Sequence, residues 1–89
     1  VKPCLDGEPG YEDIPSQFQP RNGFLDEVDA RRALYWALFS GAHGHTYGSN
    51  SIWQFHDGST SGSAWARRAW REALDLPGAG QMQHAKNLL

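Results

Sequence analysis

Two carboxylates that could act as a catalytic pair, Glu8 and Glu12, lie in the segment GEPGYEDIP at residues 7–15. A pair of carboxylates cleaves glycosidic bonds, with retention when about 5 to 5.5 Å separates them and inversion at about 6.5 to 9.5 Å. Glu8 stands at the predicted end of a strand, which suits a nucleophile or a general base. The alternatives are a solvated loop carboxylate for Glu8 and, for Glu12, an acceptor of backbone N–H groups that pins the loop.

A second group of candidates, His43, His45 and Tyr47, alternates along a predicted strand and therefore shares one face of it. His56 and Asp57 follow in the next loop, so one interpretation is a metal site. Because His-x-His without a firm third ligand is weak evidence for a metal, the prediction is no metal ion and no cofactor. The other interpretation is a polar strand end that hydrogen-bonds a sugar.

An aromatic residue in a loop, Trp53, lies between Ile52 and Phe55. Loop aromatics that face a cleft can stack on the apolar faces of sugar rings, and they can also anchor a loop in the core. A platform of Trp53, Tyr11 and Tyr47 without catalysis would make the chain a carbohydrate-binding module. That module is the alternative to an enzyme.

The elements that must position these residues alternate between strands and helices. They are a strand over residues 1–6, a helix over 27–40 capped by Asp26, a strand over 42–48, a helix over 64–76 capped by Ser63 and ended by Pro77 and Gly78, and a helix over 80–89. Alternation of this kind predicts parallel strands joined by crossovers.

Both long loops, at residues 7–25 and 49–63, follow predicted strands, as the substrate-binding loops of a (β/α)8 barrel do. A whole barrel takes about 250 residues. The predicted fold class is therefore α/β, a fragment of a (β/α)8 TIM barrel with its last two βα units and a closing helix. Residues 1–89 are expected to be a partial catalytic domain, truncated at both ends, because Val1 looks like strand and the chain ends within an apolar-periodic segment.

Composition excludes several classes of partner. The net charge of −2 gives no electrostatic footprint for nucleic acid. No apolar stretch approaches the roughly 18 residues of a membrane span. Cys4 is the only cysteine, so neither an internal disulfide nor a cysteine-based zinc site can form.

Three segments together resemble one family: KPCLDGEPGYEDIP, DARRALYWALFSGAHGHTYGSNSIWQF and LPGAGQMQHAKNLL. They are similar to the last part of the catalytic domain of apiosidase-like glycoside hydrolases, a bacterial family formerly catalogued as a domain of unknown function. The resemblance covers nearly the whole chain. It implies a (β/α)8 barrel that cleaves glycosidic bonds, with pectin side chains of plant cell walls as a known substrate class.

The resemblance implies that Glu8, at the end of the seventh barrel strand, is the nucleophile of a retaining mechanism. It also implies that the acid/base carboxylate lies near the fourth strand, outside this chain, so these residues alone should not catalyse. The implied partners are an oligo- or polysaccharide and the remainder of the parent barrel. Export from a bacterium, to the periplasm or the medium, is implied as well. The sugar and the linkage do not follow from the sequence.

The remaining site residues that the resemblance implies all shape the substrate pocket. Tyr11 and Glu12 shape its wall, His45 and Tyr47 its floor, and Asn50 and Trp53 the loop along the cleft. Glu12 would also brace its own loop. His43 departs from the family pattern, in which a small residue is expected.

Overall fold

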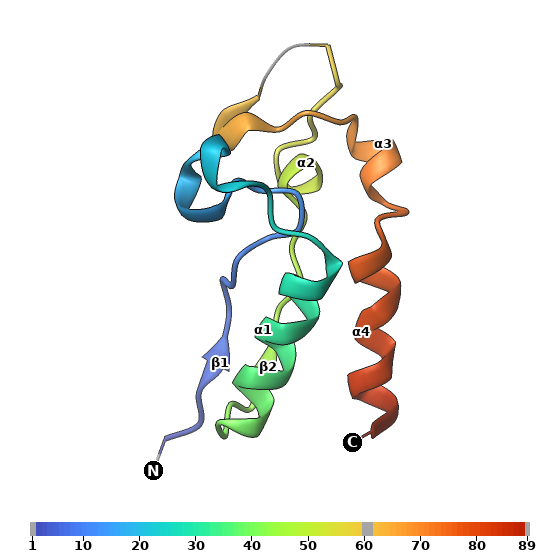
Figure 1. The fold of residues 1–89 in the computed structure, drawn as a ribbon. Coiled ribbons are helices and arrows are strands. Elements are labelled where there is room, and N and C mark those ends of the chain that lie inside the picture. Colours follow the sequence, from blue (N-terminus) through green and yellow to red (C-terminus); the bar gives the residue numbers. More distant parts are fainter. Residues whose placement is uncertain (1, 60–61, 89) are drawn as a thin grey trace.

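The computed structural model describes residues 2–59 and 62–88, and Figure 1 shows their arrangement. The strands are β1 (Leu5–Asp6) and β2 (Gly44–His45), and the α-helices are α1 (Glu27–Phe39), α2 (Asn50–Trp53), α3 (Trp70–Ala73) and α4 (Pro77–Leu88). Three short 3-10 turns are η1 (Ser16–Phe18), η2 (Pro20–Asn22) and η3 (Ser63–Trp65). Val1, residues 60–61 and Leu89, which fall within the predicted first strand, second loop and last helix, lie outside the described residues.

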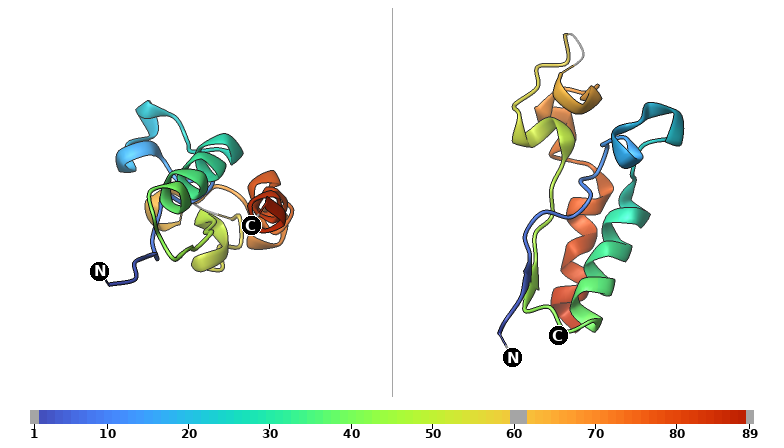
Figure 2. Two further views of the ribbon diagram at one scale, coloured as in Figure 1. Left: turned by 90° about the horizontal axis from the view of Figure 1, so that it is seen from below. Right: turned by 90° about the vertical axis from the view of Figure 1, so that its left-hand side faces the viewer.

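The two strands pair in parallel, as predicted, with Leu5 opposite Gly44 and Asp6 opposite His45. A further parallel bridge between Glu12 and Ser49 extends this pairing into both loops. Helix α1 is the crossover between the strands, and α1 and α4 form a layer on one side of them (Figure 2). The loops that follow β1 and β2 meet at one end of the molecule, far from the start of β1 and the end of α4 (Figure 1).

Helix α1 begins where the sequence predicts it to begin. The Asp26 side chain accepts hydrogen bonds from the N–H groups of Val28 (2.9 Å) and Asp29 (3.1 Å), and Asp29 bonds back to the N–H of Asp26, which completes a capping box. Ala30 and Leu34 are the buried residues of the helix.

We expect Asp26→Ala to lower the free energy of unfolding by about 1 kcal/mol at neutral pH. The hydrogen bond from the N–H of Asp29 lowers the pKa of Asp26 below its ordinary value of 3.8. The charged cap therefore contributes its full stabilisation above pH 3.8, and this stabilisation is lost as the pH falls through the lowered pKa of Asp26. Denaturant titrations at pH 7 and pH 3 should show the difference shrinking at the lower pH, with Asp26→Asn, which keeps a cap, as the control. An equal loss at both pH values would contradict this role.

The prediction of one helix over residues 64–76 is wrong. In its place the chain forms η3, an extended stretch, and the short helix α3, and the η3 turn contains the positive φ angles of Ala64 (51°) and Trp65 (55°). Ser63 is the first residue of η3 and does not cap a helix. Hydrogen bonds from Arg67 and Arg68 to Asp13 hold this stretch in an extended conformation. These tertiary contacts override the helical periodicity of the sequence.

Pro77 and Gly78 begin helix α4 rather than ending the preceding helix. Proline is favoured in the first turn of a helix, where its missing N–H would have no intrahelical partner. Because α4 starts at Pro77, the helix predicted from residue 80 gains one turn at its N-terminus.

Several large apolar residues are open to solvent in this chain. Leu5 on β1 is 66% exposed, and Trp36 on α1 is 68% exposed, with the guanidinium of Arg32 5.5 Å from its ring centroid. The buried apolar residues of the described part are mostly alanines. No helix within residues 2–59 and 62–88 is long and apolar enough to cross a membrane.

Candidate active site

A cavity of about 550 Å³ lies where the loops after the two strands meet. It brings together three of the predicted site residues, Glu8, Tyr11 and Trp53, with Glu8 exposed and Trp53 53% exposed. Among the described residues that line it, Glu8 is the only charged one, and most others are apolar or aromatic. The remaining lining residues are Pro9, Gly10, Ile14, Pro15, Gln17, Phe18, Leu25 and Ala64.

The backbone of the loop after β1 is hydrogen-bonded to the start of the loop after β2. The N–H of Glu12 donates to the carbonyl of Gly48 (2.9 Å), and the N–H of Asn50 donates to the carbonyl of Glu12 (2.9 Å). These bonds continue the parallel pairing of the strands. They fix the segment that carries Tyr11 next to the second loop.

The buried side chain of Glu12 connects the first loop to Tyr47, which follows β2, and to helix α4. The residue is 2% exposed, and its carboxylate accepts hydrogen bonds from the Tyr47 hydroxyl (2.6 Å) and from the N–H of Gly78 (3.1 Å). Gly78 lies in the first turn of α4, where the helix dipole favours a negative charge. Burial, together with the Glu12 carboxylate, raises the pKa of Tyr47, so its hydroxyl stays a donor through the physiological range.

We expect Tyr47→Phe to lower the free energy of unfolding by about 2 kcal/mol, because it leaves a buried carboxylate with one hydrogen bond fewer. Tyr35→Phe is the matched control, since none of the described residues hydrogen-bonds its hydroxyl. Chemical denaturation of the two variants checks this. Equal stability of both variants, with a raised KM only in Tyr47→Phe, would instead assign Tyr47 to substrate binding.

His45 and Tyr47 do not line the cavity that holds Glu8. They line a second cavity of about 360 Å³ between α1, β2 and α4, together with Leu34 and Met82. The His45 side chain is 3% exposed, and its Nδ1 lies 2.9 Å from Oδ2 of Asp6 on the neighbouring strand. The described structure therefore does not bring His45 and Tyr47 together with Glu8 as the floor of one pocket.

Asn50 is fully buried and holds the second loop together. Its amide donates to the carbonyls of Asp13 (3.2 Å) and Ala64 (2.8 Å), and its Oδ1 accepts from the Trp53 indole N–H (3.3 Å) and from Gln54 (3.0 Å). Asn50 thus orients Trp53 at the cavity wall. Substrate contact by Asn50, Glu12, His45 or Tyr47 stays a prediction.

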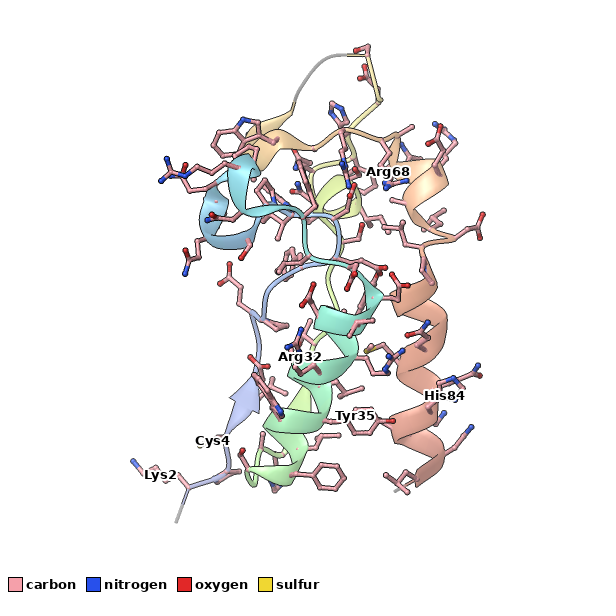
Figure 3. The ribbon with its side chains drawn as sticks, in the orientation of Figure 1. Lys2, Cys4, Arg32, Tyr35, Arg68 and His84 are labelled. Atoms are coloured by element: carbon pink, nitrogen blue, oxygen red, sulfur yellow. The ribbon has the colours of Figure 1, made fainter. Side chains whose placement is uncertain are left out.

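A charge cluster that no sequence motif predicts lies beside the cavity. The Asp13 carboxylate, 3% exposed, accepts from Arg67 Nε (2.9 Å) and Nη2 (2.6 Å) and from Arg68 Nε (2.9 Å). The hydrogen bond to Asp13 raises the pKa of Arg68, which lies among the loops in Figure 3. The Arg67 guanidinium also lies 3.8 Å from the ring centroid of Phe24. No local sequence pattern links these residues.

The alternative metal site is not assembled. Within residues 2–59 and 62–88, no three His, Cys, Asp or Glu side chains are grouped so that they could hold a metal ion. The three histidines of that alternative, His43, His45 and His56, are therefore not a ligand set.

Comparison with known proteins gives a consistent result. The sequence matches the family described as "Apiosidase-like, catalytic domain" over residues 1–89. It is 44% identical, with a TM-score of 0.91, to a solved structure named "Glycoside hydrolase". It is 42% identical, also with a TM-score of 0.91, to a glycoside hydrolase family 5 structure from Bacteroides vulgatus ATCC 8482. No curated protein matches.

The matched structures are much longer than this chain. Each alignment covers 99% of this chain and 20% of the other, so the chain spans about a fifth of the length of these relatives. The predicted fold class, a fragment of a (β/α)8 barrel, is confirmed.

Proposed function

Because the chain belongs to the apiosidase-like family of glycoside hydrolase catalytic domains, we propose that its parent protein is a retaining glycoside hydrolase with Glu8 as the nucleophile. The observation that carries the proposal is the position of Glu8. It follows the end of β1, it is exposed, and it is the one charged residue on the described wall of a cavity that also carries Tyr11 and Trp53.

In the proposed reaction the ionised carboxylate of Glu8 attacks the anomeric carbon as the bond to the leaving oxygen breaks. A carboxylic acid from the remainder of the barrel protonates that oxygen. Water, deprotonated by the same residue, then hydrolyses the glycosyl ester and releases the sugar with its configuration retained. Because this chain does not supply the acid, these 89 residues alone should be inactive.

The aromatic walls of the cavity support a sugar as the ligand. Tyr11 and Trp53 offer rigid apolar faces, against which the C–H faces of a sugar ring can pack, and they stand on the same cavity as Glu8. Glu12 and Asn50 then support the site indirectly, since they hold the two loops that present these aromatics. We propose oligosaccharides from plant or microbial polysaccharides, such as pectin side chains, as substrates.

A glycosidase assay of the complete gene product tests the proposal. We expect hydrolysis of pectin side-chain oligosaccharides, and proton NMR at early times should show the product with the anomeric configuration of the substrate. An inverted product would remove Glu8 from the role of nucleophile. Sugar binding without hydrolysis would favour the carbohydrate-binding module.

A further inference from the structure

We propose that Gly48 is a positioning residue of the active site, because its missing side chain lets the ring of Tyr11 rest directly on the backbone of the loop that follows β2. This inference rests on the proposed function. Tyr11 stands on the wall of the cavity that holds Glu8, whereas Gly48 lies outside that wall. Gly48 therefore acts on the site only through the tyrosine.

The contact between Gly48 and Tyr11 leaves no room for a side chain. A Cβ built on Gly48 would lie 2.6 Å from Cγ of the Tyr11 ring and still closer to Cδ1 and Cε1. Real Cβ atoms essentially never approach other atoms within 3.0 Å, so something must shift. Positive φ angles occur at Gly23, Gly41 and Gly58 but not at Gly48, so the requirement for glycine here is one of space.

The backbones on both sides of the contact cannot retreat easily. The carbonyl of Gly48 accepts the N–H of Glu12, which directly follows Tyr11, and Asn50 donates to the carbonyl of Glu12. The Glu12 side chain is itself fixed by Tyr47 and Gly78. A methyl group at Gly48 would therefore displace the Tyr11 ring rather than the main chain.

A displaced Tyr11 ring changes the shape of the wall of the cavity that also holds Glu8. Misplacement of a substrate-positioning group by about 1 Å can cost about a hundredfold in rate. We expect Gly48→Ala to lower kcat/KM about ten- to a hundredfold, mostly through KM. Gly80→Ala in α4, where a Cβ would meet nothing within 4 Å, should stay within about twofold of the wild type.

The decisive experiment is a double-mutant cycle in the complete gene product, with KM and the unfolding temperature measured for wild type, Gly48→Ala, Tyr11→Ala and the double variant. Because Tyr11→Ala removes the clashing ring, adding Gly48→Ala to it should change KM and unfolding temperature little. If Gly48→Ala alone fails to fold, the double variant should fold.

Two results would overturn the inference. The first is an additive effect, in which Gly48→Ala is as harmful in the Tyr11→Ala background as in the wild type. The second is a Gly48→Ala enzyme with wild-type KM. If the wild type itself hydrolyses no glycoside, the proposed function fails instead. The unfolding temperatures of the same cycle would then still report whether Gly48 seats Tyr11.

Discussion

Replacing Glu8 with glutamine in the complete gene product should lower kcat by roughly three orders of magnitude or more, because an amide cannot form the glycosyl–enzyme ester. The fold should be unaffected. Glu8 is exposed, and none of the described residues hydrogen-bonds its side chain, so the free energy of unfolding should stay within about 0.5 kcal/mol of the wild type. Initial rates and a thermal unfolding curve followed by circular dichroism measure both quantities.

The matched control is Glu72→Gln, which changes an exposed carboxylate on α3 outside the cavity and should keep wild-type turnover. A Glu8→Ala variant should regain turnover when azide is added, because the small anion can occupy the space of the carboxylate and attack the anomeric carbon itself. Near-wild-type turnover of Glu8→Gln would show that another residue is the nucleophile.

Local sequence signals predicted the elements that local interactions stabilise. Helix α1 was predicted within a residue of its bounds because its cap, Asp26, and its apolar spacing both lie within the segment. The parallel pairing of β1 with β2 followed from the alternation of strands and helices. The predicted helix over residues 64–76 failed because the competing contacts, from Arg67 and Arg68, reach a loop 54 and 55 residues earlier.

The sequence predicted which loops carry the candidate site but not all the contacts within it. Glu8, Tyr11 and Trp53 could be placed together because both of their loops follow parallel strands, which end on the same side. Sequence alternation placed His45 and Tyr47 on one face of a strand but could not say which cavity that face would border. The role of Asp13 could not be predicted, because its partners Arg67 and Arg68 lie 54 and 55 residues away in the sequence.

Asp13 joins the two loops that present the aromatic residues of the cavity. Its N–H donates to the carbonyl of Leu25 within the first loop (2.8 Å), and its carbonyl accepts from the Asn50 side chain of the second loop (3.2 Å). Its φ of 65° lies in the left-handed region, which aspartate and asparagine tolerate better than most residues. The carboxylate also binds the guanidinium groups of Arg67 and Arg68, so one buried side chain holds the stretch between η3 and α3 against the first loop.

We expect Asp13→Asn to lower the free energy of unfolding by about 2 to 3 kcal/mol, because it removes charge-assisted hydrogen bonds to two guanidinium groups and keeps the backbone conformation. The loss should stay below that of a fully buried ion pair, since the Arg67 and Arg68 side chains are 49% and 38% exposed and can turn to water. Chemical denaturation gives the free energy. Limited proteolysis should show faster cleavage in residues 7–25 and 62–69.

The control is Asp75→Asn, an exposed carboxylate between α3 and α4, which should change stability by less than about 0.5 kcal/mol. Arg67→Ala should cost less in the Asp13→Asn background than in the wild type, because the two residues act through one contact. Additive losses would mean that Arg67 stabilises the loop through Phe24, which its guanidinium covers at 3.8 Å, rather than through Asp13. Unchanged stability and unchanged proteolysis of Asp13→Asn would show that the backbone bonds alone hold the two loops together.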